Sequence, residues 1–295
     1  MRLVAGEADA GEPLLRFAAA RGGIPEETAR AAILRGGAFV RGRRVRDPDL
    51  TVRGGDRIEL DLREPVTVEL PRLLHLDPLV VAVDKPAGVL AQEGRAGGPA
   101  LPDLCSRILR ERGEPDAALL VHRLDRGTTG VTVLARTRAA QAALLREFRE
   151  GRVAKEYLAL CAGDPAADDL ASDLALGPDP GTPGKHRPDP RGARARTRFR
   201  VLRRLRGAAL VAAFPETGRT HQVRVHLAAL SLPLLGDLRY GGPRAVARAD
   251  GHRLEISRPL LHAISLRLRH PAGGELALRA EPPGDLTAAL EFLSG

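Results

Sequence analysis

The sequence predicts an α+β fold: a large mixed sheet, mostly antiparallel, flanked by helices and loops and preceded by a small α+β domain. Two observations predict this class. Strand-like segments outnumber helical ones over most of the chain and recur in hairpin-like pairs, whereas the first stretch combines two helices with short strands. We therefore divide the 295 residues into a small domain at 1–62, a linker at 63–72 and a large domain at 73–295.

The small domain begins with two helices. EPLLRFAAARG predicts a helix that ends at two glycines, and IPEETARAAILRGG predicts a second one with a proline and acids in its first turn. FVRGRRV then predicts a hairpin that turns at Arg41 and Gly42, and GGDRIELDL a half-buried strand. The unit carries many arginines, at positions 30, 35, 41, 43, 44 and 46.

The large domain opens with a buried strand at 79–83 and a helix at 99–113. The stretch VHRLDRGTTGV at 121–131 follows apolar residues and precedes VTVLAR, so we expect a loop between two strands. The next segment predicts a helix capped by Thr137 and ended by Gly151.

The rest of the chain predicts mostly strands. A strand is expected at 153–161 and a strand pair at 195–215, and further strands at 260–280 close the sheet. The proline- and glycine-rich stretch at 176–192 has no periodicity and predicts an exposed, mobile loop. A helix with Thr220 as its cap is expected after ETGR.

The charge of the chain favours a polyanionic partner. The formal net charge is +9, nearly all basic residues are arginine, and arginine binds phosphate oxygens through two hydrogen bonds. No apolar run approaches the ~18 residues of a membrane span, and the N-terminus lacks the apolar core of a signal peptide. The two cysteines are expected to be buried thiols. These features predict a cytoplasmic protein with nucleic acid as its first expected partner and no membrane partner.

The loop at 121–131 is the first candidate for chemistry. It places Asp125 between Arg123 and Arg126, and positive neighbours favour the charged form of a carboxyl group. Gly127 and Gly130 allow a sharp turn and the close approach of a substrate. A charged carboxylate suits a nucleophile, but by itself the loop is equally typical of a surface salt bridge. A metal-dependent nuclease is disfavoured because the turn offers a single acid.

Several blocks together identify a family. VVAVDKPAGVLAQEG (80–94), HRLDRGTTGV (122–131), VAKEYLAL (153–160), ETGRTHQVRVHLAALSLPLLGDLRYG (216–241) and RPLLHAISLRLRHP (258–271) occur in this order. With these blocks the chain resembles the RNA pseudouridine synthases of the RluA type. Where the family usually has TSG, this chain has Thr128, Thr129 and Gly130, a change that keeps the hydroxyl group.

The resemblance implies the isomerisation of a uridine within RNA. The base is detached, rotated and rejoined to the sugar through carbon five, without cofactor or metal. Asp125 matches the catalytic aspartate of the family, acting either at the anomeric carbon or through a glycal route. Tyr157 matches the tyrosine that packs on the target base and is a candidate proton acceptor at carbon five. Arg219 matches the arginine that pairs with the catalytic aspartate; the alternative is a loop arginine that contacts phosphate.

The same resemblance suggests three substrate-binding residues. Arg123 is expected to fill the space of the everted base, or else to hold the turn. Leu261 is a candidate pocket wall, and Lys85 is a candidate phosphate contact or the cap of a turn. The family needs no metal, and the histidines lack a familiar ligand spacing, so no metal site is assigned; these histidines are at positions 122, 221 and 226.

The small domain resembles the RNA-binding module first described in a small-subunit ribosomal protein, called here the S-four-type module. The resemblance lies in ILRGGAFVRGRRV and the later Gly55–Asp56, although Arg41 stands where the module usually has asparagine. An ordinary α+β cap with solvated arginines is the alternative. Together the two resemblances predict action on large-subunit ribosomal RNA, with tRNA as a second possibility. We expect the protein to bind RNA as a monomer and to have no DNA partner. The rival function is a non-catalytic RNA-binding or ribosome-assembly factor on the same fold.

Overall fold

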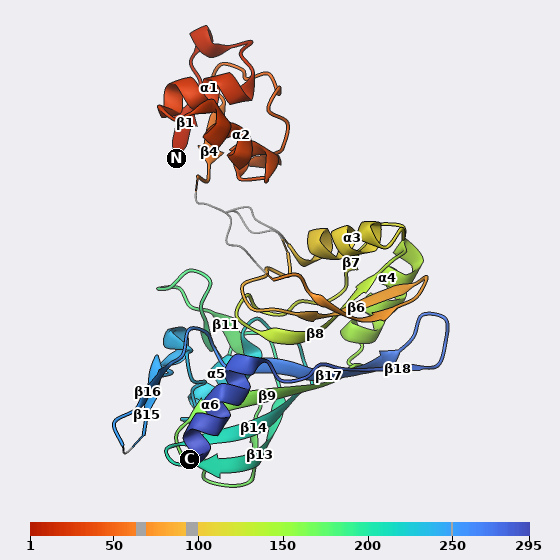
Figure 1. The fold of residues 1–295 in the computed structure, drawn as a ribbon, viewed down its shortest axis with the longest axis vertical. Coiled ribbons are helices and arrows are strands. Elements are labelled where there is room, and N and C mark those ends of the chain that lie inside the picture. Colours follow the sequence, from red (N-terminus) through yellow and green to blue (C-terminus); the bar gives the residue numbers. More distant parts are fainter. Residues whose placement is uncertain (63–68, 93–99, 249) are drawn as a thin grey trace. The chain divides into compact units, whose positions relative to one another are not determined.

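A computed structural model describes residues 1–62, 69–92, 100–248 and 250–295, and the chain separates into two compact units. The first holds residues 1–62, and the second holds residues 69–91 and 101–295 (Figure 1). Residues 63–68 of the expected linker lie outside the described residues, and its last residue, Arg72, already begins a strand. No helix in the described part of the chain is long and apolar enough to cross a membrane.

Two helices and a four-stranded antiparallel sheet form the first unit. The strand order is β1-β4-β2-β3, and the apolar face of both helices packs on the sheet around Phe17, Ile33 and Ile58. The elements are β1 (Arg2–Val4), η1 (Glu7–Asp9), α1 (Leu14–Gly22), α2 (Glu26–Leu34), β2 (Ala38–Val40), β3 (Arg43–Val45) and β4 (Arg57–Leu60).

The expected hairpin between β2 and β3 is present. Its turn residues, Arg41 and Gly42, both have positive φ angles, of 52° and 75°. This conformation is cheap for glycine and costly for arginine. Arg41 forms an ion pair with the buried Asp56, which helps to hold the turn.

A ten-stranded mixed sheet dominates the second unit. The order is β10-β13-β14-β9-β17-β8-β6-β5, with β18 paired to β17 and β7 to β8, and the pair β8–β17 is parallel. This agrees with the predicted fold class. The strands are β5 (Arg72–Leu76), β6 (Val80–Lys85), β7 (Leu119–Leu120), β8 (Thr129–Ala135), β9 (Ala154–Ala162), β10 (Asp169–Ser172), β13 (Thr197–Leu205), β14 (Ala208–Pro215), β17 (Leu261–Arg269) and β18 (Glu275–Arg279).

Helices cover both faces of this sheet. Alternate residues of a strand point to opposite faces, so Val80 packs in the cluster under α4 and Val81 in the cluster under α3. In the other half of the sheet α5 covers one cluster and α6 another. The helices are α3 (Leu101–Glu111), α4 (Arg138–Arg149), α5 (Gln222–Ala229), η2 (Leu238–Tyr240) and α6 (Gly284–Ser294).

The parallel contact between β8 and β17 lies in the middle of the sheet. Gly130 pairs with Ala263 there at φ 114°, and a Cβ at this glycine would lie 2.2 Å from the Ala263 carbonyl oxygen. Only glycine fits so close an approach. The neighbouring Thr129 shares a 2.8 Å hydrogen bond with Nδ1 of the buried His262, a bond that a serine would also form.

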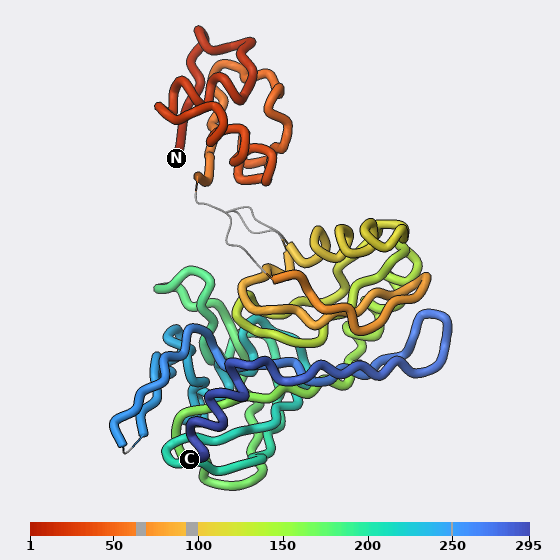
Figure 2. Tube along the Cα trace, in the orientation of Figure 1, coloured from red at the N-terminus to blue at the C-terminus, as the bar shows by residue number. Residues whose placement is uncertain are grey.

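Several local predictions were wrong. The stretch 176–192, expected as an irregular loop, contains the hairpin of β11 (Leu176–Pro178) and β12 (His186–Pro188), where the prolines lie at the strand ends. The cap of α5 is His221 instead of Thr220. Strands β5 and β10, the small sheet of β15 (Ala245–Ala247) and β16 (Arg253–Glu255), and helix α6 were not predicted. Figure 2 traces the long β17–β18 hairpin that precedes α6.

Candidate active site

Asp125 lies in the turn that joins β7 to β8. The turn is closed by the Thr128 N–H, which donates to the Asp125 carbonyl oxygen at 3.0 Å. The carboxylate is 19 % exposed, so a ligand in the adjoining cavity can reach it. The loop predicted from the sequence therefore places its single acid at the floor of a cavity.

The ion-pair partner of Asp125 is Arg224, so the predicted pairing with Arg219 was wrong. Arg224 Nη1 donates to Asp125 Oδ2 at 3.1 Å. Its Nε and Nη2 donate to the two oxygens of the buried Asp237, at 2.7 and 2.8 Å. Arg219 lies on the cavity rim, where its Nε donates to the Arg194 carbonyl oxygen at 3.0 Å.

This arrangement has a simple electrostatic reason. Burial disfavours the charge of Arg224, but the two carboxylates of Asp237 and Asp125 outweigh burial and raise its pKa. A bidentate pair with Asp237 fixes the plane of the guanidinium, and the third N–H direction then points at Asp125. The charge on Arg224 is thus permanent and its position is set independently of Asp125.

Two basic side chains, Lys85 and Arg258, contact the backbone of the turn that contains Asp125. Lys85 is fully buried, and its Nζ donates to the carbonyl oxygens of Pro86 at 3.0 Å, Val89 at 3.1 Å and Arg126 at 3.5 Å. Burial is the main cause that lowers the pKa of Lys85 to about 7. Of the two roles expected for Lys85, the structure shows the cap of a turn. The expected contact with an RNA phosphate is wrong, because the amino group faces the protein interior.

Arg258 supports the other side of the turn. Its Nη1 donates to the Gly127 carbonyl oxygen at 3.0 Å, while Nε and Nη2 bind the two oxygens of Asp285 in α6. Lys85 and Arg258 thus fix the carbonyl groups of residues 126 and 127, which directly follow Asp125. Contacts from β6, from the turn itself and, through Arg258, from α6 therefore hold the backbone next to the Asp125 carboxylate.

The cavity beside Asp125 has a volume of about 660 Å³, which is within the range of ligand pockets. Four other residues that the sequence singled out line it: Arg123, Tyr157, Arg219 and Leu261. Both arginines are exposed, Tyr157 is half-buried and Leu261 is buried. The cavity therefore combines an apolar wall, an aromatic ring, a carboxylate and exposed cations.

Tyr157 belongs to the central strand β9, where it pairs with Ala213 of β14 and Ala263 of β17. Burial, and next the nearby charge of Asp125, raise the pKa of Tyr157. Its phenol consequently stays protonated at neutral pH. On the same strand, Lys155 donates to the Thr217 carbonyl oxygen at 2.9 Å, and burial lowers its pKa to about 8.

All three histidines noted in the sequence have hydrogen-bond partners, and that of His221 is the Tyr240 hydroxyl. His122 Nε2 accepts the Val133 N–H at 2.9 Å, its ring stacks on Phe148, and burial lowers its pKa to about 3. His226 is fully buried between Thr197 Oγ1 and the Leu174 carbonyl oxygen. The third, His221, lines the cavity, and its Nε2 lies 3.8 Å from Asp125 Oδ2.

Arg224 is the residue that sequence reasoning missed. It lies in the run VRVHL, on a helix that is buried on nearly every side. An arginine among apolar helical residues must have a partner when it is buried, and this is the signal that could have identified it. Arg219 was chosen instead because, in TGRTHQ, it matches the arginine that the family resemblance pairs with the catalytic aspartate.

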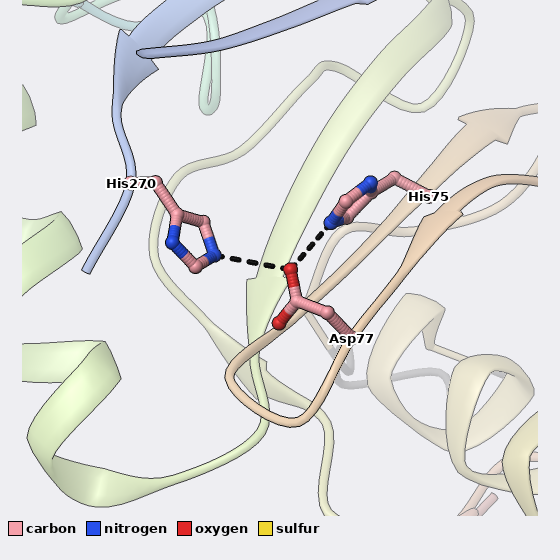
Figure 3. A group of neighbouring side chains, drawn as sticks. All are labelled: His75, Asp77 and His270. Carbon is pink, nitrogen blue, oxygen red and sulfur yellow. Dashed lines mark hydrogen bonds and ion pairs between the residues drawn. The ribbon is translucent and has the colours of Figure 1, made fainter. Parts of the chain in front are cut away.

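One cluster outside the cavity has the residue types of a metal site. His75, Asp77 and His270 place their side-chain ligand atoms within 4.8 Å of one another (Figure 3). Asp77 Oδ2 lies 2.5 Å from His75 Nε2 and 3.0 Å from His270 Nε2, while the Ala272 N–H donates to His270 Nδ1. That contact leaves the proton of a neutral His270 on Nε2, directed at Asp77. Hydrogen bonding therefore accounts for the cluster, which links the β5–β6 turn to the β17–β18 turn.

Comparisons with known proteins identify the family of this chain. Residues 79–229 match the model of the RNA pseudouridylate synthase family. The chain is 38% identical over 236 residues to an uncharacterized RNA pseudouridine synthase of Mycobacterium bovis, covering 78% of this chain and 75% of that protein. It is 34% identical to the ribosomal large subunit pseudouridine synthase D of Pasteurella multocida, covering 86% and 82%.

A solved structure shows the same fold. Human RNA pseudouridylate synthase domain containing 4 superimposes with a TM-score of 0.59 at 28% identity, covering 75% of this chain and 92% of that chain. The family match spans the turn of Asp125, the strand of Tyr157 and the helix of Arg224. With sequence, fold and site in agreement, the chain belongs to the RluA-type RNA pseudouridine synthases and is an isomerase that acts on RNA.

Proposed function

We propose that this enzyme isomerises uridine in large-subunit ribosomal RNA, with Asp125 as the catalytic carboxylate. The observation that carries the proposal is the ion pair of Asp125 with Arg224 at the floor of a cavity of nucleotide size. A carboxylate that attacks the sugar or abstracts a proton must be ionised. The permanent charge of Arg224 favours that form and fixes one oxygen, leaving the other for the substrate.

Tyr157 and Leu261 form the contact with the target base. Both line the cavity with Asp125, and an aromatic ring offers a stacking surface together with a polar end. Because the phenol of Tyr157 stays protonated, it accepts a proton from carbon five only if it passes its own proton on at the same time. The carboxylate of Asp125, which lines the same cavity, is assigned as the acceptor of that proton.

Arg123 and Arg219 bind the RNA around the everted nucleotide. Both guanidiniums are exposed at the cavity, and neither forms an ion pair with Asp125 among the described residues. Arg123 comes from the turn itself, where it can take the place of the everted base in the stack. Arg219 is assigned to a phosphate or sugar contact, in place of the role predicted from the sequence.

Ribosomal RNA is preferred to tRNA because several relatives are named ribosomal large subunit pseudouridine synthase D, at 32–35% identity. The first unit is assigned as an S-four-type RNA anchor. Its fold has the two helices and the hairpin expected from the resemblance, and it carries exposed arginines such as Arg30 and Arg43. Phosphate contacts from this unit would add affinity without sequence specificity.

The experiment that tests this function maps isomerised uridines across cellular RNA in cells with and without the protein. The proposal expects pseudouridines in large-subunit ribosomal RNA that disappear with the gene and return with the wild-type chain. If pseudouridines disappear only from tRNA, the substrate of the enzyme is tRNA instead of ribosomal RNA. Unchanged maps in both RNA classes would refute the proposed substrate.

A further inference from the structure

We propose that His221 and Tyr240 are positioning residues that couple the β11–β12 hairpin to Asp125, so that RNA bound at the hairpin favours the reactive position of the carboxylate. The hairpin, residues 176–188, lies outside the blocks that identify the family. The inference rests on the proposed role of Asp125, and it gives the hairpin a function in catalysis.

Two hydrogen bonds and one longer polar contact link the hairpin to Asp125. The backbone N–H of His186, the first residue of β12, donates to the Tyr240 hydroxyl oxygen at 3.0 Å. The Tyr240 hydroxyl lies 2.7 Å from His221 Nδ1. Because the phenol oxygen accepts the backbone N–H, its own proton is free to point at Nδ1. The proton of the neutral imidazole is then on Nε2, which lies 3.8 Å from Asp125 Oδ2.

His221 is held in this orientation by its backbone and its surroundings. It is the N-cap of α5 and has a φ angle of 57°, a conformation that is costly for a residue with a Cβ. Burial is the main cause that lowers the pKa of His221 to about 4; the charge of Asp125 opposes it, while Arg224, Arg239 and His186 add to it. The imidazole is therefore neutral at physiological pH and presents one N–H to the carboxylate.

Tyr240 contacts residues of both the site and the hairpin. Arg224 Cζ lies 5.0 Å from the centre of the Tyr240 ring, and Lys185 Nζ of the hairpin lies 5.7 Å from it. The residue before Tyr240 adds a direct tie, since Arg239 Nη1 donates to the Gly184 carbonyl oxygen at 2.7 Å. One ring thus contacts the cation that pairs with Asp125, the histidine beside Asp125 and a cation of the hairpin.

The ligand class of the hairpin is an RNA phosphodiester. Arg187 is fully on the surface and Lys185 is half-exposed, and both are next to His186, whose N–H begins the hydrogen-bond chain. A phosphate bound by these two cations would act on the same short strand that holds the Tyr240 hydroxyl. A nucleotide flanking the target uridine could thereby tighten the contact between His221 and Asp125.

The test is a double-mutant cycle on the full-length enzyme. It combines Tyr240→Phe with Lys185→Ala/Arg187→Ala and uses an unmodified large-subunit ribosomal RNA transcript. The single-turnover rate constant at saturating RNA and the dissociation constant are measured separately. Thr182→Ala is the matched control, because it removes an exposed side chain of the same hairpin turn that takes no part in the chain of contacts.

The proposal predicts a separation of rate from affinity. Tyr240→Phe keeps the ring and should lower the saturated rate on the order of tenfold, with the dissociation constant changed by less than about twofold. The hairpin variant should weaken binding and lower the saturated rate. In the Tyr240→Phe background the hairpin change should weaken binding and leave the saturated rate unchanged, because the hydroxyl that links His186 to His221 is already missing. Thr182→Ala should match the wild type.

Two results would overturn the coupling. One is a Tyr240→Phe enzyme with the wild-type saturated rate, and the other is a purely additive loss of rate when the two changes are combined. Either result leaves the proposed function intact as long as Asp125→Asn, assayed in parallel, is inactive. If Asp125→Asn is active as well, the proposed role of Asp125 fails first.

Discussion

Arg224 contacts two carboxylates at once, Asp237 through a bidentate pair and Asp125 through a single hydrogen bond of 3.1 Å. The first contact is fully buried, and the second faces the cavity. Asp237 therefore fixes the position of the Arg224 guanidinium, and this guanidinium in turn holds the Asp125 carboxylate. This division explains how the Asp125 carboxylate is held in position beside the cavity.

Replacing Arg224 by alanine should damage both folding and activity. Asp237 would remain buried without its partner, and removing one member of a buried pair costs about 3–5 kcal/mol. The rate at saturating RNA should fall by at least ~100-fold. Arg219→Ala is the matched comparison: it should keep stability within about 0.5 kcal/mol and weaken RNA binding. Denaturant unfolding, single-turnover rates and filter binding measure the three quantities. A stable, active Arg224→Ala enzyme would contradict this assignment.

Tyr157→Phe separates stacking from proton transfer. The phenylalanine ring keeps the apolar contact with the base, so the RNA dissociation constant should change by no more than about twofold. Loss of the hydroxyl should slow turnover by roughly 100-fold, the lower range for a general acid–base group. Single-turnover assays with RNA in excess measure the effect. Full activity would show that the hydroxyl is not needed.

Asp77 should make stability depend on acid pH. Burial opposes its charge, but hydrogen bonds from His75 and from the Leu79 and Val80 N–H groups outweigh burial and lower its pKa to about 2. A lowered carboxyl pKa stabilises the fold above the ordinary value near 3.8, and the benefit is lost as the pH falls towards 2. Asp77→Asn should therefore cost about 2 kcal/mol at pH 7 and less than about 0.5 kcal/mol at pH 2, where the folded-state carboxyl is half protonated. Urea unfolding at both pH values tests this, and an equal cost at both would contradict it.

The small domain should contribute affinity and salt dependence. Changing Arg30 and Arg43 to alanine should reduce the slope of log affinity against log salt by about 2, because each phosphate contact contributes about 0.9. The rate at saturating RNA should stay unchanged. Arg2→Ala is the control, since this exposed arginine is already paired with Glu59. An unchanged slope in the double variant would mean that this surface does not bind RNA.

Much of the fold could be predicted from the sequence because its strands have clear apolar patterns. The two-sided burial of β6 is visible in the continuous run VVAV, and Thr137 caps α4 as expected. The hairpin at 176–188 could not be predicted, because its strands are three residues long and are held by contacts such as that of His186 with Tyr240. Those partners are more than fifty residues apart in sequence.

The active site, too, could be predicted only in part, because some of its contacts are visible only in the folded structure. The family blocks identified the turn of Asp125 and the strand of Tyr157, both of which line the cavity. They could not decide between Arg219 and Arg224, which are five positions apart and differ in whether the side chain points into the cavity wall or to its rim. The sequence left two roles open for Lys85, because lysine is rarely buried, and only the structure shows the three carbonyl groups that bind it in the turn.

The central claim is tested most directly by Asp125→Asn, assayed for pseudouridine formation on an unmodified large-subunit ribosomal RNA transcript, with RNA binding measured on the same preparation. Asparagine keeps the shape of the side chain and removes its charge. The account predicts no detectable conversion, with RNA affinity retained, because only the carboxylate performs the chemistry. Conversion at the wild-type rate would contradict the account.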